Sequence, residues 1–417
     1  MTFALSDSMA LSAGTNACCL THFVRVQVSE PTPQSLTLEL APYLAANAIC
    51  ARTGVTDKEI LAQRLTEARQ KFSSFGLPPS VIRARQLVFF PRIDDISLVN
   101  GELRIAEPQQ RHLQLFDNYS DLKSKDIAAR HQCFEQVADD CLEEMYIDDE
   151  GVPDDLIHVT SSGYLAPSPV QRLAARRGWL RTTVTHGYHM GCYGGFSAIR
   201  MAHGFLASAQ LGVTPPKERV DIVHTEILSA HHEVEELTPP NIITMTLFGD
   251  GFIKYSVSTE DHLKSRGLAG LKILSYTEHL LSGSADAETL APGPKRFHIC
   301  ISIMTPVFIK AAVTELVQDL MRRAGLEFER ERDRLVFAIH PGGPKIVEHI
   351  QSKLKLDNDQ VALSKAVLLE NGNMSSATVP HILKAIVDEP GVPFGARIIA
   401  IGFGPGLTMT GLLLQKI

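Results

Sequence analysis

Leu156-Ile-His-Val-Thr-Ser-Ser-Gly163 and Val336-Phe-Ala-Ile-His-Pro-Gly-Gly343 are two versions of one pattern, an apolar strand that runs into a turn of small residues. Each copy is followed, at a similar spacing, by a glycine-flanked bend and a helical pattern, first at Cys192 and then at Asn373. A repeated unit predicts similar halves that share one core. Such halves would bring the helix starts at Cys192 and Asn373 together.

Length and composition support this division. The chain has 417 residues, which suits two fused halves, and we predict a flexible arm at 1–20, an N-terminal half at 21–255 and a C-terminal half at 256–417. Hydrophobic residues make up 44% and charged residues 21%, as in soluble globular proteins. The net charge of −7 argues against a nucleic-acid partner. No apolar run is long enough to cross a bilayer and the start lacks a basic signal region, so we expect no membrane partner and a cytoplasmic protein.

Local patterns predict the elements around the two bends. Alternation predicts a strand at 22–28, and helical spacing predicts a surface helix at 56–75 that opens with a capping box between Thr56 and Glu59. The residues after Cys192 are apolar at helical spacing with few charges, which predicts a buried helix.

Cys192 is a candidate nucleophile. It lies in Gly191-Cys-Tyr-Gly-Gly195, where a strand turns through glycines into a helix. Unpaired N–H groups at a helix start favour an anion, and a nearby histidine would lower the thiol pKa further, so we expect a stabilised thiolate. The simpler alternative is a tight crossover that holds a small buried cysteine.

His340 and Asn373 are the candidate partners of the cysteine. His340 ends an apolar strand before a Pro-Gly-Gly-Pro turn, and ligands bind at such strand ends in α/β sheets. Asn373 offers an amide N–H, a donor suited to holding an oxyanion. A structural histidine and a simple helix cap are the alternatives.

Metal chemistry is not indicated. None of the seven cysteines forms a C-x-x-C pair, which suits free thiols in a reducing compartment. The sequence His231-His-Glu233 suggests an exposed acidic turn rather than a metal site. Gly402-Phe-Gly-Pro-Gly406 lacks the Lys-Ser/Thr pair of a phosphate loop, and we interpret it as a backbone wall of the cavity.

Five ordered motifs resemble the type III polyketide synthases, the chalcone and stilbene synthase family. They are GCYGG at 191–195, LFGDG at 247–251, IHPGGP at 339–344, GNMSSA at 372–377 and GFGPGLT at 402–408. The resemblance covers about residues 150–417 and is weak before them. It implies an α/β thiolase-like fold, with two similar βαβαβ halves in a five-layered αβαβα arrangement.

The resemblance also implies residue roles and a reaction. Cys192 matches the nucleophile that carries an acyl starter, and His340 and Asn373 match the residues that support decarboxylation of a malonyl thioester and the Claisen condensation. The implied product is a pyrone, a resorcinol or a phloroglucinol-type compound. Further positions are assigned to substrate binding, namely the gatekeepers Phe248 and Phe297 and the cavity residues Ser161, Ser162, Ser375 and Gly342. His231 and Leu228 replace the small polar residues common in plant members, which suggests a cavity for an aliphatic starter.

The thioester donor is open at this point. We expect no permanently bound cofactor, with acyl-CoA and malonyl-CoA as substrates, or an acyl carrier protein as the donor instead. Lys71 and Lys345 are the candidate coenzyme A contacts, and Arg83 and Arg85 are further basic residues that would compensate for the family contacts that are missing. The alternative function is a non-condensing acyltransferase that uses carrier-bound acyl groups. The resemblance further implies a homodimer.

Overall fold

A nine-stranded mixed sheet runs through the computed structural model, which describes residues 17–91, 96–99, 102–105, 126–149 and 151–417. The strand order within these residues is β13-β14-β15-β10-β1-β9-β8-β6-β7. The bounds of these strands are β1 (Cys18–Val26), β6 (Asp155–Thr160), β7 (Thr183–Tyr188), β8 (Arg219–Glu226), β9 (Gly251–Thr259), β10 (Leu271–Leu280), β13 (Leu335–Ile339), β14 (Arg397–Gly404) and β15 (Thr408–Lys416).

The sheet repeats one pairing pattern. In the N-terminal half β6 pairs with β8 in parallel, β8 with β9 antiparallel and β9 with β1 antiparallel. In the C-terminal half β13, β14, β15 and β10 follow the same sequence of parallel, antiparallel and antiparallel pairs. The two halves join where β1 also pairs with β10 at Cys19 and Leu20. The internal repeat predicted from the two strand-and-turn segments is therefore confirmed in the sheet.

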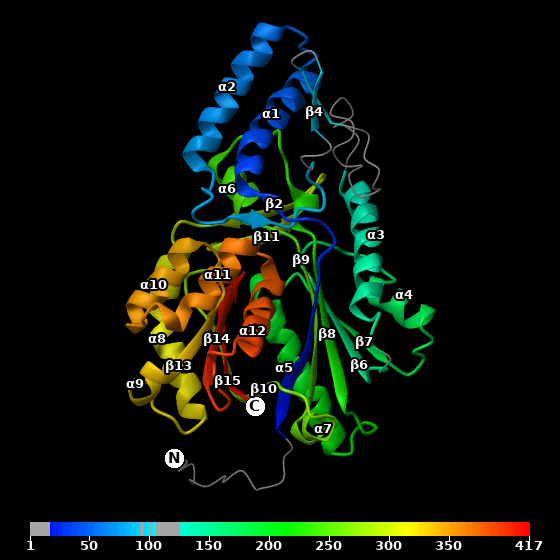
Figure 1. The fold of residues 1–417 in the computed structure, drawn as a ribbon, viewed down its shortest axis with the longest axis vertical. Helices are drawn as coiled ribbons and strands as arrows, with labels where there is room; N and C mark the ends of the chain where they lie inside the picture. Colours follow the sequence, from blue (N-terminus) through cyan, green and yellow to red (C-terminus); the bar gives the residue numbers. More distant parts are fainter. Residues whose placement is uncertain (1–16, 92–95, 100–101, 106–125, 150) are drawn as a thin grey trace, which may run out of the picture.

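Helices form the other layers (Figure 1). Two helices, α5 (Gly194–Gln210) and α12 (Thr378–Asp388), lie between the two groups of strands, and each contacts strands of both halves. The predicted burial of α5 holds for its first six residues, whereas its C-terminal half reaches the surface at Arg200, His203 and Gly204. On the outer faces, α3 (Ile127–Met145) contacts β8 and β9, and α8 (Thr305–Arg323) contacts β10 and β15. This is the α/β thiolase-like, five-layered arrangement predicted from the sequence.

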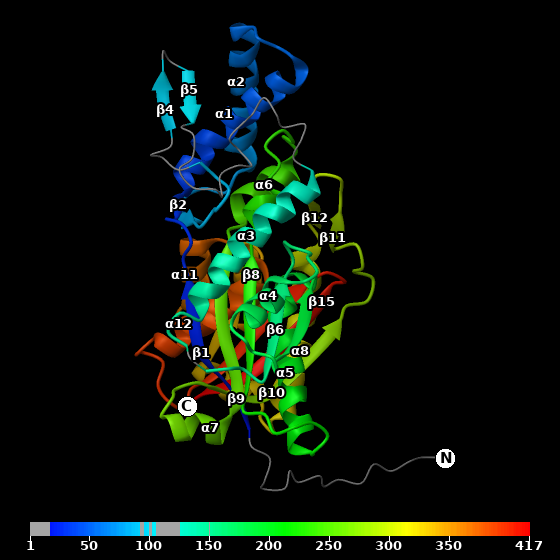
Figure 2. The ribbon, with the colours of Figure 1, turned by 90° about the vertical axis from the view of Figure 1, so that its right-hand side faces the viewer.

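A helical pair projects from one end of the molecule (Figures 1 and 2). The pair consists of α1 (Gln34–Thr53) and α2 (Lys58–Phe75), and α2 contacts α6 (Pro239–Leu247) below it. No helix in the described part of the chain is long and apolar enough to span a membrane. The remaining elements are β2 (Thr32–Pro33), β3 (Ala84–Arg85), β4 (Ile96–Val99), β5 (Glu102–Ile105), α4 (Pro169–Arg176), α7 (Glu260–Arg266), β11 (Glu288–Pro292), β12 (Phe297–Ile301), α9 (Phe328–Glu331), α10 (Pro344–Leu354) and α11 (Ala362–Asn371).

Two local expectations are corrected. Strand β1 begins at Cys18, inside the stretch assigned to the arm, because its first residues pair with β9 and are buried. The cap of α2 is Asp57, whose carboxylate accepts the backbone N–H of Glu59, so the capping box expected from Thr56 is wrong. The helix was expected in the right place, but the choice between adjacent capping residues depends on backbone angles. The boundary between the halves at 255/256 falls within β9 and stays a prediction.

Glycines in β14 let the two halves approach closely, which gives a stability prediction. A Cβ on Gly402 would lie 2.4 Å from the ring of Phe196 in α5. Gly402→Ala should therefore lower the free energy of unfolding by about 1–3 kcal/mol, the usual cost of overpacking a dense core. Chemical denaturation measures the difference.

Gly204→Ala is the matched control, because Gly204 lies in α5 and a Cβ there meets nothing within 4 Å. Removing a helical glycine should leave stability unchanged or raise it by up to ~1 kcal/mol. Equal losses in both variants would contradict the close-approach argument.

Candidate active site

Cys192 lies in a short turn, Gly191–Tyr193, between β7 and the start of α5. Gly191 has φ of 67°, and a Cβ there would lie 2.6 Å from Cδ of Pro405, so the turn requires glycine for its backbone angle and for space. The N–H of Gly191 donates to Oγ of Ser161 at 3.0 Å. Ser161, a predicted cavity residue, therefore anchors the turn that presents the cysteine.

Asn373 faces Cys192 across the boundary between the halves. The thiol of Cys192 is 4.0 Å from Oδ1 of Asn373 and 3.9 Å from Oγ of Ser375. Oδ1 of Asn373 also accepts the N–H of Ser375 at 2.8 Å, which fixes the orientation of the amide. The buried Nδ2 of Asn373 has no hydrogen-bond partner among the described residues. A fixed amide with a free N–H is suited to donate to an oxyanion.

The loop that carries Asn373 also touches the predicted gatekeeper Phe248. Asn373 and Phe248 form an isolated parallel bridge, and the N–H of Asn373 donates to the carbonyl oxygen of Leu247 at 3.0 Å. Phe248 is buried in a small cluster with Leu228 and neighbouring apolar side chains. This position is compatible both with ordinary core packing and with the predicted gatekeeper role of Phe248 in a cavity wall.

His340 is fully buried directly after β13. The backbone N–H of His340 donates to the carbonyl oxygen of Ile401 at 2.8 Å. Its imidazole ring meets the Phe403 ring edge-on, with the ring centroids 5.1 Å apart. Gly342 lies against the same ring, because a Cβ there would be 2.7 Å from Phe403. Neither ring nitrogen of His340 has a partner among the described residues, and burial lowers its pKa to about 3. His340 is therefore a neutral imidazole, with one N–H to donate and one nitrogen to accept.

The stabilised thiolate expected from the sequence is not what the structure shows. Burial raises the pKa of Cys192 well above its ordinary value, the nearby carboxyl of Glu288 raises it further, and contacts from Ser375 and Asn373 lower it only in part. The imidazole of His340 is not hydrogen-bonded to the thiol. The loss of solvation raises the pKa by more than the N–H groups at the start of α5 lower it, so the resting group is a thiol.

The glycine-rich segment at 402–406 forms the wall behind the cysteine. A Cβ on Gly404 would lie 2.7 Å from the ring of Tyr193, next to Cys192 in the chain. The same strand carries Phe403, the neighbour of His340. One strand thus contacts both the cysteine turn and the histidine, which agrees with the wall interpreted from the sequence.

Glu226, at the end of β8, is a site residue that the sequence analysis missed. Its carboxylate accepts the N–H of Ser161 at 2.9 Å, the hydroxyl of Ser162 at 3.1 Å and the hydroxyl of Ser376 at 2.5 Å. Burial still raises its pKa to about 7, although these hydrogen bonds lower it. The signal in the sequence was an acidic residue ending an apolar strand. Glu226 ties the predicted cavity serines of one half to the Asn373 loop of the other.

His231 and Phe297 fill another side of the site. The exposed turn expected at His231 and His232 is wrong, because both side chains are buried. Nε2 of His231 donates to the carbonyl oxygen of Ser162 at 2.7 Å, and Nδ1 accepts the N–H of Phe297 at 3.2 Å, so a neutral ring satisfies both contacts. The rings of His231 and Phe297 stack with centroids 4.8 Å apart. The predicted gatekeeper Phe297 is therefore linked to Ser162 through the ring of His231.

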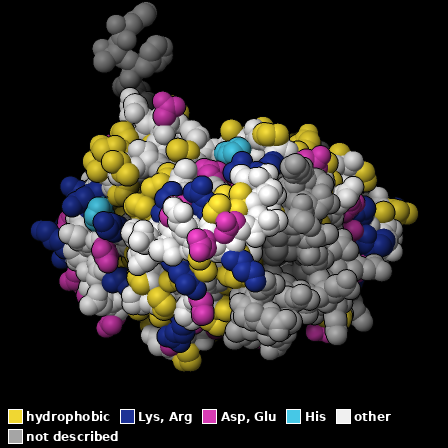
Figure 3. Space-filling model, turned by 90° about the horizontal axis from the view of Figure 1, so that it is seen from above, with side chains coloured by type: hydrophobic (Ala, Val, Ile, Leu, Met, Phe, Trp, Pro, Cys, Tyr) yellow, Lys and Arg dark blue, Asp and Glu magenta, His cyan; other side chains and the backbone are white. Residues whose placement is uncertain are grey.

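The predicted coenzyme A contacts lie apart from this cluster. Lys71 is exposed on α2 and donates to the carbonyl oxygen of Leu237 at 3.2 Å, and Lys345 is exposed at the start of α10. Arg85 cannot contact coenzyme A at the surface, because its side chain is fully buried. Its guanidinium donates to the backbone carbonyls of Met245 and Phe248 instead. On the face that Figure 3 shows, basic and acidic side chains are interspersed over the described surface.

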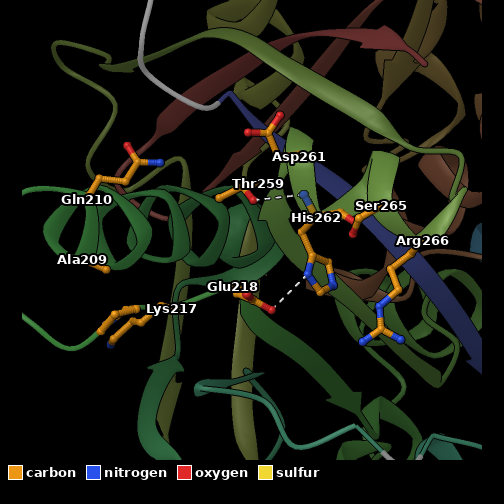
Figure 4. A pocket seen from close by; sticks show the side chains of 10 residues that line it. Ala209, Gln210, Lys217, Glu218, Thr259, Asp261, His262, Ser265 and Arg266 are labelled. Carbon is orange, nitrogen blue, oxygen red and sulfur yellow. Dashed lines mark hydrogen bonds and ion pairs between the residues drawn. The ribbon is translucent and has the colours of Figure 1, made fainter.

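A surface pocket of about 590 Å³ belongs to a different region (Figure 4). It lies at the C-terminal end of α5, where Gln210, Lys217 and His262 line it. Cys192 is at the opposite end of the same helix, ~25 Å away at 1.5 Å per residue. The pocket is therefore separate from the cluster around Cys192.

Comparisons with known proteins give the relatives of this chain. Residues 289–417 match the C-terminal domain of chalcone and stilbene synthases. The 1,3,6,8-tetrahydroxynaphthalene synthase of Streptomyces coelicolor is 29% identical over 61% of this chain and 64% of its own length. Type III polyketide synthase A of Arabidopsis thaliana is 26% identical over 63% of this chain and 65% of its own length. The chain thus matches less than two thirds of either relative.

Solved structures share the fold over nearly the whole chain. The crystal structure of the Streptomyces coelicolor tetrahydroxynaphthalene synthase has a TM-score of 0.70 at 22% identity and covers 95% of this chain and 99% of its own. The structure of PKS-I from the brown alga Ectocarpus siliculosus has a TM-score of 0.73 at 21% identity and covers 97% of this chain and 100% of its own. These likenesses establish the thiolase-like fold.

The raised pKa of Cys192 gives a labelling prediction. The alkylation rate of Cys192 by iodoacetamide should keep rising at alkaline pH, since only the thiolate reacts. Burial raises the pKa of Glu288 to about 8, so its charge opposes the thiolate mainly above that pH. Glu288→Gln should therefore label faster than the parent protein above about pH 8, and the two rates should converge at about pH 7.

Cys300 is the internal control, because it is exposed and should label at the same rate in both proteins. Peptide mass spectrometry separates the two sites. A Cys192 rate that reaches its plateau below about pH 7 would contradict the buried, neutral thiol.

Proposed function

Since residues 289–417 belong to the chalcone and stilbene synthase family and the chain as a whole has the fold of type III polyketide synthases, we propose that this protein is a condensing enzyme of that kind. It would load an acyl starter onto Cys192, decarboxylate a malonyl thioester and form a new carbon–carbon bond. The observation that carries the proposal is the meeting of Cys192 with Asn373, whose amide N–H is buried and unpaired.

Loading is thioester exchange. The sulfur of Cys192 attacks the thioester carbonyl of the starter, the thiol of the donor leaves, and the proton from Cys192 passes to that leaving thiol. His340 is neutral, has a free ring nitrogen and lies beside Phe403 of β14, the strand that also contacts the cysteine turn, so it is suited to accept this proton when substrate draws the groups together. A neutral thiol and a neutral imidazole avoid burying two charges before substrate arrives.

Decarboxylation produces the nucleophile. When carbon dioxide leaves the malonyl thioester, the electron pair of the broken bond forms an enolate with negative charge on the thioester oxygen. The N–H of neutral His340 and Nδ2 of Asn373 would donate to that oxygen, and both are unpaired in the structure. The enolate carbon then attacks the acyl carbon on Cys192 and expels the sulfur, which retakes a proton because its pKa is high.

Substrates and products follow the same proposal. The donors are acyl and malonyl thioesters of coenzyme A or of an acyl carrier protein, with no permanently bound cofactor, and Lys71 and Lys345 remain the proposed coenzyme A contacts. Repeated rounds and ring closure would give a pyrone, a resorcinol or a phloroglucinol-type product. In classification terms the activity is that of an acyltransferase, and the working unit would be a homodimer. The relatives do not favour the non-condensing alternative.

Radiolabelled malonyl-CoA tests the proposal. Incubation with acyl-CoA starters should release labelled carbon dioxide, and Asn373→Ala should lower the rate by about 10²–10³-fold, the cost of removing one oxyanion donor. Asn371→Ala is the matched control, because Asn371 is two residues away and its side chain binds Arg25 and the carbonyl of Val367 instead.

The outcomes separate the two functions. Mass spectrometry of an acyl group on Cys192, discharged to an alcohol or amine without carbon dioxide release, would support the non-condensing acyltransferase. No decarboxylation with any starter would contradict a condensing enzyme.

A further inference from the structure

Glu288 is a buried acid that the mechanism above does not use. It is the first residue of β11, pairs with Ile301 of β12 and is 7% exposed. Its neighbour Ala287 is held from three sides, since its N–H donates to Ser284 and its carbonyl accepts the N–H of Ser302 and the hydroxyl of Thr305. The backbone that presents Glu288 is therefore fixed.

The position of Glu288 is also tied to the wall of the site. The N–H of Leu407, directly after the glycine-rich segment, donates to Oγ of Ser284 at 3.0 Å and lies 3.2 Å from its carbonyl oxygen. The same segment places Pro405 against Gly191. Hence β11, the wall and the cysteine turn form one connected unit.

The carboxyl group of Glu288 accepts no hydrogen bond from the described residues, and loss of solvation alone raises its pKa to about 8. Glu226 differs, because the backbone and hydroxyl groups of Ser161, Ser162 and Ser376 surround its carboxylate with donors. Glu288 keeps a small exposed fraction, and no donor holds its carboxyl group, so this group is available to a ligand at the proposed reactive site.

Glu288 points toward the nucleophile. Its Oε1 lies 3.9 Å from the position that a Cβ on Gly191 would take, directly before Cys192. The charge of its carboxylate raises the pKa of both Cys192 and Tyr193, the titratable groups of that turn. Among the other elements packed against Glu288, β12 places Ile301 opposite it. The hydroxyl of Thr305 in α8 donates to the carbonyl oxygen of Ala287 and not to Glu288. No described cation offsets the acid.

We propose that Glu288 is a specificity-determining residue that donates a hydrogen bond from its protonated carboxyl group to an oxygen on the acyl chain carried by Cys192. This inference rests on the proposed function. It assigns the site to acyl groups with a carbonyl or hydroxyl oxygen close to the thioester, such as 3-oxoacyl groups, in preference to plain alkyl chains. The aliphatic starter suggested by Leu228 and His231 is then not the preferred acyl group.

Neutral acid chemistry explains the selection. At about pH 7 a carboxyl group with a pKa near 8 is mostly protonated, so it can donate a hydrogen bond, as other buried carboxylic acids do in enzymes. A 3-oxoacyl group supplies the acceptor, whereas an alkyl chain leaves the buried acid unpaired and is rejected for that reason. No bond is made or broken at Glu288.

Single-turnover acylation of Cys192 by acetoacetyl-CoA and butyryl-CoA tests the inference, because these thioesters share chain length and differ at the third carbon. The ratio of the two rates should fall about five- to tenfold in Glu288→Leu, the worth of one neutral hydrogen bond. Comparing ratios between proteins cancels the difference in intrinsic reactivity. Thermal unfolding of each variant checks that it is folded.

Glu288→Gln separates the hydrogen bond from a packing effect. Its amide still donates, so it should keep the preference at about pH 7 and retain it at about pH 9.5, where the ionised acid of the parent protein loses it. A ratio unchanged in Glu288→Leu with loading intact, or an identical pH profile in parent and Glu288→Gln, would overturn the role of Glu288. Absence of loading by the parent protein with either thioester would overturn the proposed function and, with it, this inference.

Discussion

The close approach of β14 to the cysteine turn is the contact on which the rest of the site depends. Gly402 and Gly404 leave room for the rings of Phe196 and Tyr193, so the start of α5 lies directly against the C-terminal half. That contact places Cys192 opposite Asn373. Phe403 lies between the two glycines on β14, and its ring packs against His340. A side chain at either glycine would separate the halves where Cys192 and Asn373 meet.

Loss of solvation determines the charge of every reactive group in this closed space. It keeps Cys192 a thiol and His340 a neutral imidazole, and it raises the pKa of both buried acids. The acids differ in their partners: Glu226 is held by serine donors, and Glu288 has none among the described residues. An uncharged cysteine and an uncharged histidine suit the proposed reaction, in which the charge on the enolate appears only when carbon dioxide leaves.

Some expectations failed where a local pattern was compatible with two environments. The histidines at 231 and 232 follow a strand and precede an acidic run, which resembles an exposed turn, yet His231 satisfies both ring nitrogens inside the core. Arg85 is among the residues expected to compensate for missing coenzyme A contacts, but its buried guanidinium donates to the backbone carbonyls of Met245 and Phe248. In both cases the deciding neighbours are remote in the chain.

The amino-acid sequence by itself determined the repeated halves and the helix after Cys192, and it predicted the trio Cys192, His340 and Asn373, because periodicity, glycine turns and ordered motifs are local properties. The tertiary structure alone decided protonation and the approach of Glu288. Protonation depends on how completely water is excluded, which the neighbours of a residue in space set. The place of Glu288 depends on contacts among β11, the cysteine turn and the segment at 402–406, and no spacing in the chain encodes their meeting.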